Sequence, residues 1–241
     1  MAMDILRQIE KGLIVSCQAP PDDPLHGSLI MAKMAKAAEL GGAVGIRANG
    51  YEDILAIKRE VKLPIIGLIK KRYEGYQPYI TPTMDEVDRV VEAGAHIIAV
   101  DATQSLKPGE VTTAQFIAMI RKKYPETLIM ADISTYEEGL EAYHLGFDLI
   151  STTLSGYTDH SPPKEGPDFE LIERLAKDVR VPVIAEGRIW TPEEAVKAFE
   201  KGAYAVVVGT AITRPLEITK RFIYSINGWR SKCCRSKTVS S

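Results

Sequence analysis

The chain has 241 residues, a formal net charge of -2 and an apolar share of 45%. A chain of this length fits one large domain or two small ones, and its apolar share is enough for a full core. The nearly balanced charge gives no electrostatic basis for binding nucleic acid or an acidic membrane surface, so we expect a small-molecule partner.

The first residues and the cysteine count indicate a cytoplasmic protein. The first residues, MAMDILRQIEKG, lack the apolar stretch of a signal peptide, and no apolar run reaches the length of a membrane span. Three cysteines are too few for a disulfide framework, and two of them, Cys233 and Cys234, are adjacent. Residues 229–241 are rich in Ser and Lys, so we expect a disordered tail after a single domain over residues 1–228.

Short apolar, β-branched runs recur along the chain, and each is followed by a helical pattern. In chain order these runs are GLIVSCQA, GAVGIRAN, PIIGLIK, HIIAVDAT, LIMADIST, FDLISTTLS, VPVIAEGR and AYAVVVGT. Such runs are typical of strands that are buried on both faces of a parallel sheet. Eight strand–helix units in one domain predict an α/β fold, the (β/α)8 TIM barrel.

The intervening segments have the start and stop signals of helices. Thr83, Thr135 and Thr191 each lie three residues before a Glu, which is the spacing of a capping box. A glycine recurs between a helical pattern and the next strand, as in EAGAHIIAVD and EKGAYAVVVGT, which indicates a repeated unit. A doubly wound open sheet is the alternative, but no G-x-G-x-x-G follows the first strand.

Polar side chains end nearly every predicted strand. The two-residue alternation of a strand points one set of them into the barrel: Gln18, Arg47, Lys70, Asp101, Asp132, Thr153 and Glu186. Active sites of such barrels lie where the strands end. Cations and acids that meet there are costly to desolvate unless they bind a polar ligand or neutralise one another, so a structural ion-pair network is the alternative to a ligand site.

The last two strands predict a place for a phosphate group. Gly187 and Gly209 follow them, and backbone N–H groups without a neighbouring side chain can approach an anion there. Arg214 follows shortly after and is either a charged contact to the ligand or a surface arginine. None of the four histidines ends a strand, and the cysteines lack metal-ligand spacing, so we expect no metal site.

Several motifs, in order from about Gly12 to Phe222, resemble those of the N-acylglucosamine-6-phosphate 2-epimerase family: LIVSCQA, GGAVGIRA, LPIIGLIK with YITPT, ADIST, STTLSGYT, VIAEGRI and GTAITRP. The resemblance implies a barrel enzyme, commonly a homodimer, that interconverts N-acetylmannosamine 6-phosphate and N-acetylglucosamine 6-phosphate. It implies a role in the breakdown of sialic acid and related amino sugars, without metal or redox cofactor.

The resemblance also assigns roles to individual residues. It implies proton transfer by Lys70 and Glu186, ligand contacts by Gln18, Arg47, Asp132 and Arg214, and phosphate held near Gly187, Arg188, Gly209 and Thr210. We expect the segment after Lys70 to be a loop over the substrate, with Tyr79 and Thr81 as possible contacts, and Thr153 as a further contact at its strand end.

The chemistry implied by the family makes specific demands on these residues. Inversion at C2 requires loss of its proton, which is acidic only beside an open-chain aldehyde, so the ring must open first, with Asp132 or Glu186 as acid or base. Lys70, poorly hydrated and close to Arg47, is expected to have a lowered pKa that lets it act near neutral pH. Either Lys70 and Glu186 act on opposite faces of C2, or one residue moves the proton between both faces.

Two other functions remain open from the residues alone. A lysine at the end of a barrel strand also suits a Schiff-base aldolase or lyase that acts on a sugar phosphate. A sugar-phosphate sensor without catalysis would keep the same barrel, although the presence of both Lys70 and Glu186 favours an enzyme.

Overall fold

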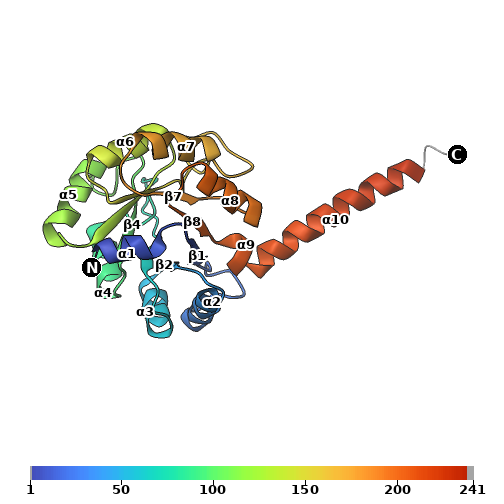
Figure 1. The fold of residues 1–241 in the computed structure, drawn as a ribbon, viewed down its shortest axis with the longest axis horizontal. Coiled ribbons are helices and arrows are strands. Elements are labelled where there is room, and N and C mark those ends of the chain that lie inside the picture. The colour runs from blue at the N-terminus through green and yellow to red at the C-terminus, as the bar shows by residue number, and fades with distance from the viewer. Residues whose placement is uncertain (1, 238–241) are drawn as a thin grey trace.

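A closed parallel barrel forms the centre of the molecule (Figure 1). The computed structural model describes the backbone of residues 2–237 and the side chains of residues 2–231. Within this range eight strands follow one another around the barrel: β1 (Leu13–Cys17), β2 (Gly45–Asn49), β3 (Ile65–Leu68), β4 (Ile97–Asp101), β5 (Leu128–Asp132), β6 (Leu149–Ser151), β7 (Val183–Glu186) and β8 (Ala205–Val208). The (β/α)8 barrel predicted from the sequence is therefore confirmed.

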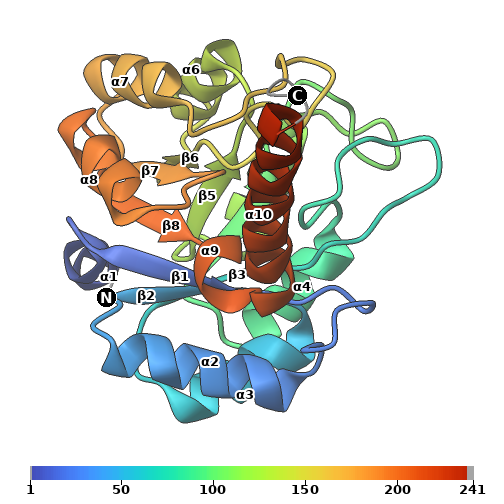
Figure 2. The ribbon, with the colours of Figure 1, turned by 90° about the vertical axis from the view of Figure 1, so that its right-hand side faces the viewer.

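Seven helices connect successive strands and cover the outside of the barrel. They are α2 (Ser28–Leu40), α3 (Tyr51–Glu60), α4 (Met84–Glu92), α5 (Thr113–Lys123), α6 (Tyr136–His144), α7 (Phe169–Asp178) and α8 (Pro192–Glu200). Figure 2 shows α2 and α3 on one side of the strands and α6 and α7 on the opposite side. The three capping boxes predicted at Thr83, Thr135 and Thr191 are present, and a fourth, Thr112 with Gln115, begins α5.

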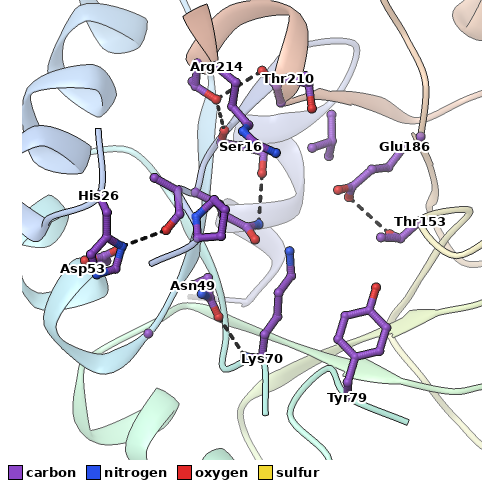
Figure 3. A pocket seen from close by; sticks show the side chains of 18 of the residues that line it. Ser16, His26, Asn49, Asp53, Lys70, Tyr79, Thr153, Glu186, Thr210 and Arg214 are labelled. Atoms are coloured by element: carbon purple, nitrogen blue, oxygen red, sulfur yellow. Dashed lines mark hydrogen bonds between the residues drawn. The ribbon is translucent and has the colours of Figure 1, made fainter. Parts of the chain in front are cut away.

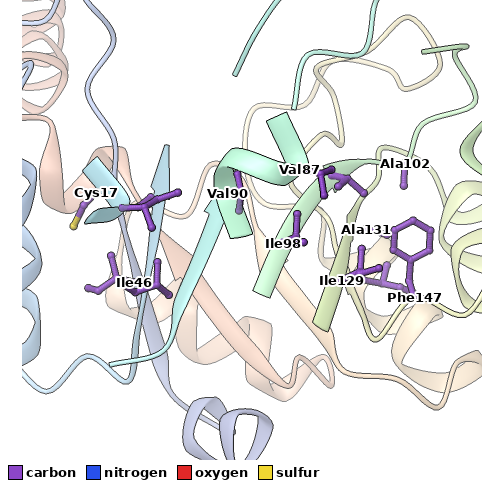
Figure 4. Close-up of a cluster of buried hydrophobic side chains, with 14 of the residues drawn as sticks. Cys17, Ile46, Val87, Val90, Ile98, Ala102, Ile129, Ala131 and Phe147 are labelled. Carbon is purple, nitrogen blue, oxygen red and sulfur yellow. The ribbon is translucent and has the colours of Figure 1, made fainter. Parts of the chain in front are cut away.

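Alternation along the strands divides the apolar side chains between two layers. Side chains that point outward, such as Ile46, Ile98 and Ile129, pack beneath the helices (Figure 4). Side chains that point inward, such as Ile66 and Met130, fill the barrel. Because the inner layer is apolar at the start of the strands, the polar residues of the same inward rows gather at their carboxyl ends.

The first helix, α1 (Ala2–Ile9), closes the other end of the barrel. Ile9 is fully buried within the inner layer, and Ile5 and Leu6 pack against the same layer. The Tyr204 hydroxyl donates a hydrogen bond to the Leu6 carbonyl at 2.9 Å, which ties α1 to the segment before β8. A polar ligand therefore meets the inward-pointing residues only at the carboxyl ends of the strands.

The chain leaves the barrel after β8 through a short helix, α9 (Thr210–Thr213), and a long one, α10 (Pro215–Lys237), which projects as a single rod (Figure 1). The sequence predicts a disordered tail from residue 229, whereas the backbone stays helical to Lys237. Extending a helix that has already formed costs far less than starting one, so a Ser- and Lys-rich segment can continue it. The side chains of Cys233 and Cys234, and residues 238–241 entirely, lie outside the described residues.

No helix among residues 2–237 is both long and apolar enough to cross a membrane. The 23 residues of α10 would reach across a bilayer by length, but the helix has several charged side chains.

Gly67 in β3 packs closely against α4 and the segment that follows it. A Cβ atom there would lie 2.6 Å from Ala95 Cβ and 2.9 Å from Val90 Cγ1. We predict that Gly67→Ala lowers the free energy of unfolding by about 1–3 kcal/mol, because the strand or its neighbours must move. Urea denaturation measures the effect, and Gly166→Ala, where a Cβ meets no atom within 4 Å, is the control. Equal stability of the two variants would contradict the prediction.

Candidate active site

A cavity of about 910 Å³ opens at the carboxyl ends of the strands. Most of the residues predicted from the sequence line it: Gln18, Lys70, Tyr79, Thr153, Glu186, Gly187, Arg188, Gly209, Thr210 and Arg214. Figure 3 shows Lys70, Tyr79 and Glu186 directed into the same space, with Thr210 and Arg214 on another side of it. Arg47, Asp132 and Thr81 do not line the cavity.

Arg47 and Asp132 lie directly beneath the cavity as a buried ion pair. Their side chains are 1% and 0% exposed, and Arg47 Nη1 and Nη2 donate to the two Asp132 carboxylate oxygens at 3.0 and 2.6 Å. Arg47 Nη1 also lies 3.0 Å from Glu186 Oε2. Burial alone would lower the pKa of Arg47, but the two carboxylates raise it above its usual value. These two residues, expected as ligand contacts, therefore support Glu186 from below.

Glu186 ends β7 and lies at the floor of the cavity, with its side chain 14% exposed. Thr153 Oγ1 lies 3.2 Å from its Oε2 atom. Burial and the neighbouring Asp132 carboxylate raise the pKa of Glu186, although Arg47 and Lys70 oppose the shift. A carboxyl group with a raised pKa can hold a proton closer to neutral pH than a solvated one, as a general acid must.

Lys70 follows β3 and extends its amine into the cavity (Figure 3). Its backbone N–H donates to Asn49 Oδ1 at 2.7 Å, which fixes the start of the side chain. The side chain is accessible to solvent through the mouth of the cavity, but protein surrounds it on the other sides. Loss of hydration is the main cause that lowers the pKa of Lys70, and repulsion from Arg47 is the second. The sequence predicts this direction, and Glu186 and Asp132 oppose the shift.

The pKa values of Lys70 and Glu186 are thus shifted toward each other. Among the described residues no ion pair within 4.0 Å joins Lys70 Nζ to a carboxylate, so space for a small molecule remains between the two groups. The amine is easier to deprotonate and the carboxyl easier to protonate than in water. This pair can exchange one proton with a bound molecule in either direction.

Gly187 and Gly209 form the part of the cavity where a phosphate is expected. Gly187 has a φ of 111°, which strongly favours glycine, and a Cβ at Gly209 would lie 3.2 Å from Ser16 Cβ. Arg214 lies beside them; its Nε donates to Asp23 Oδ2 at 3.2 Å, and its Nη2 lies 3.1 Å from the same oxygen. Sequence reasoning missed Asp23, because a carboxylate in a Pro- and Asp-rich loop has no periodic signal.

Arg188 lines the cavity, but its guanidinium is engaged elsewhere. Its Nε donates to the Gly166 carbonyl at 2.9 Å and its Nη2 to the Ser155 carbonyl at 2.5 Å. The same guanidinium packs over the ring of Tyr157. The side chain therefore holds the loop after β6, and only its backbone N–H or its unpartnered Nη1 atom is available to a phosphate.

The loop after β3 brings Tyr79 to the cavity and keeps Thr81 out of it. Thr81 is fully buried with a φ of 47°, and its hydroxyl accepts a hydrogen bond from the Ile69 N–H at 3.1 Å. The Tyr79 N–H donates to Asp101 Oδ2 at 3.3 Å, so the end of β4 holds the loop. Thr81, expected as a possible contact, instead fixes the base of this loop.

The raised pKa of Glu186 predicts how stability depends on pH. Because the folded state binds this proton more tightly than the unfolded state, stability falls as the pH rises from about 4.5 through the raised pKa. Glu186→Gln lacks this titrating group. Its free energy of unfolding should therefore increase relative to that of the wild type as the pH rises across this range. Urea denaturation at several pH values measures it, with the exposed Glu126→Gln as control. A difference independent of pH would refute the shift.

Comparisons with known proteins identify the family of the chain. Residues 31–228 match the NanE family, described as "Putative N-acetylmannosamine-6-phosphate epimerase". A protein of Caldanaerobacter subterraneus subsp. tengcongensis named "Putative N-acetylmannosamine-6-phosphate 2-epimerase" is 71% identical, over 98% of this chain and 100% of its own length. A protein of the same name from Clostridium perfringens (strain SM101 / Type A) is 54% identical, over 90% of this chain and 98% of its own.

One solved structure supports the same family, and a second supports the fold. The N-acetylmannosamine-6-phosphate 2-epimerase from Clostridium perfringens superposes with a TM-score of 0.88 at 53% identity, over 91% of this chain and 95% of that one. A thiamine phosphate pyrophosphorylase from Pyrococcus furiosus, with a TM-score of 0.60 and 19% identity over 89% of this chain and 93% of that one, shares the fold alone. The chain belongs to the N-acetylmannosamine-6-phosphate epimerase family.

Proposed function

We propose that this chain interconverts N-acetylmannosamine 6-phosphate and N-acetylglucosamine 6-phosphate, in the breakdown of sialic acid and related amino sugars. The main observation is that Lys70 and Glu186 extend into one cavity with pKa values shifted toward each other. The family and the relatives bear the name of this epimerase, and an epimerase at C2 needs exactly one proton removed and one returned.

Ring opening comes first, because the C2 proton is acidic only beside a free aldehyde. Of the two carboxyl groups considered for this step, Glu186 lines the cavity and Asp132 lies beneath it. Glu186 is therefore better placed to exchange a proton with the ring oxygen or the C1 hydroxyl.

Epimerisation then proceeds by proton transfer alone, without metal or redox cofactor. In one direction neutral Lys70 removes the C2 proton and becomes an ammonium, while the electrons move to the aldehyde oxygen and form an enolate. Protonated Glu186 returns a proton to the opposite face of C2, and the carbonyl reforms. The pair then holds Lys70 as a cation and Glu186 as an anion, which is the starting state for the reverse reaction.

The remaining cavity residues suit the rest of the substrate. Backbone N–H groups near Gly187, Gly209 and Thr210, with Arg214, would hold the phosphate, and all four residues line the cavity. Gln18 donates from Nε2 to Ser16 Oγ at 3.0 Å, and its buried Oε1 atom has no hydrogen-bond partner. This oxygen can accept a hydrogen bond from a substrate hydroxyl or from the acetamido N–H.

The proposed enzyme is a homodimer. Helix α10 exposes several large apolar side chains, among them Phe222 at 67%, Tyr224 at 83% and Trp229 at 64%. Large exposed apolar surface of this kind is typical of interaction sites, and a second copy of the chain would cover it.

The activity is tested by NMR of N-acetylmannosamine 6-phosphate in D2O. The wild type should form N-acetylglucosamine 6-phosphate with deuterium at C2, because the returned proton comes from a group that exchanges with solvent. Lys70→Ala and Glu186→Gln should each lose at least about 100-fold in rate, since each removes one proton-transfer group. Comparable rates in both variants and the wild type would refute the assignment.

Lys71→Ala is the matched control for the lysine. Lys71 is the next residue, but its amine pairs with Glu86 at 3.0 Å outside the cavity, so this variant should keep the wild-type rate. The same proteins separate the epimerase from a Schiff-base aldolase. Borohydride should trap no covalent adduct on Lys70 during turnover, whereas an adduct that disappears in Lys70→Ala would establish the aldolase instead.

A further inference from the structure

One carboxylate oxygen of Asp132 and one of Glu186 have the same two neighbours, Arg47 Nη1 and Thr153 Oγ1. Arg47 Nη1 lies 3.0 Å from Asp132 Oδ1 and 3.0 Å from Glu186 Oε2. Thr153 Oγ1 bridges the same two oxygens, at 2.6 Å from Asp132 and 3.2 Å from Glu186. The four atoms close a ring in which a guanidinium and a hydroxyl each link both acids.

The hydroxyl and the guanidinium differ in one respect that matters for proton transfer. The guanidinium always carries its protons, whereas the Thr153 hydroxyl has a single proton and can donate to only one carboxylate at a time. The oxygen at 2.6 Å is the better acceptor by distance, so the proton points to Asp132. A Thr153 hydroxyl that donated to Glu186 would lower the pKa of that residue, but with its proton on Asp132 it presents a lone pair to Glu186.

A lone pair facing Glu186 favours the protonated form of that residue. The proton of a neutral Glu186 can be donated to Thr153 Oγ1, whereas an ionised carboxylate meets the lone pair unfavourably. Ser151, which is fully buried, has its Oγ atom 2.8 Å from Thr153 Oγ1 and can donate to the second lone pair. In this arrangement the hydroxyl groups of Ser151, Thr153 and protonated Glu186 each donate one hydrogen bond.

We propose that Thr153 is a positioning residue that stabilises the protonated form of Glu186 by giving its own proton to Asp132 and accepting the proton of Glu186. When Glu186 passes that proton to C2, rotation of the Thr153 hydroxyl supplies a hydrogen bond to the new carboxylate, and Asp132 keeps its two bonds from Arg47. No proton leaves Thr153 or Asp132, and no heavy atom has to move. The kinetic part of the inference rests on the proposed epimerase reaction.

Substitution of Thr153 tests this role through the titration of Glu186. In protein with 13C-labelled glutamate carboxyl carbons, the Glu186 signal is assigned by its loss in Glu186→Gln and is followed from about pH 5 to about pH 10. Thr153→Val should lower the Glu186 midpoint by about one pH unit, the amount expected for loss of one hydrogen bond. Thr153→Ser should restore it. Thr153→Ala replaces the valine variant if that variant does not fold.

Thr152→Val is the matched control. Thr152 is the preceding residue, and its hydroxyl bonds the Glu186 backbone, accepting from the N–H at 3.1 Å and donating to the carbonyl at 2.9 Å. This variant should lose stability without moving the midpoint. The pH dependence of kcat should shift with the titration in each variant. An unchanged or raised midpoint in Thr153→Val overturns the inference, and because the titration needs no turnover, this failure is distinct from an absence of epimerase activity.

Discussion

The site depends on the buried contact of one guanidinium with two carboxylates. Arg47 neutralises Asp132 through two hydrogen bonds and lies within 3.0 Å of Glu186, with almost no access to solvent. One cation cannot fully compensate two anions in a poorly hydrated place, so Glu186 tends to hold a proton. Lys70 supplies the second cation at the cavity. Because the pair of Lys70 and Glu186 has the same total charge whichever of them carries the proton, this proton can move at little electrostatic cost.

The barrel makes such a cluster possible because its other end is sealed and its interior is apolar. Ile66, Leu68 and Met130 exclude water below the charges, and α1 closes the bottom. An ion-pair network and a ligand site were alternatives for the sequence, and in the structure the charged residues lie at two levels. Arg47 and Asp132 form the lower, structural level, and Lys70 and Glu186 form the upper level that faces the cavity.

The sequence predicted the barrel and the direction of its inward side chains, because burial on both faces and a period of two are local properties of a strand. It could not predict height along the barrel axis. Height follows from strand register. Arg47 pairs with Ser16 of β1, and the next inward position after Ser16 is Gln18, so Arg47 lies below Gln18. Thus the sequence directs Arg47 and Asp132 inward but does not show that they lie beneath the residues that line the cavity.

Loop residues were the least predictable part of the site. Asp23 holds Arg214, yet it comes from a polar segment with no periodicity. Thr81 and Arg188 lie in loops beside the cavity, but their side chains form hydrogen bonds with backbone groups of the protein. Such pairings depend on which loops the closed barrel brings together, and this is not encoded in any short segment.

The pKa of Lys70 is the most direct measure of the charge balance in the cavity. NMR titration of its ε-methylene group should give a midpoint below 10.5 in the wild type and a still lower one in Glu186→Gln, because that variant removes the nearby negative charge. An ordinary midpoint near 10.5, unchanged by the substitution, would contradict a shared proton between these two residues.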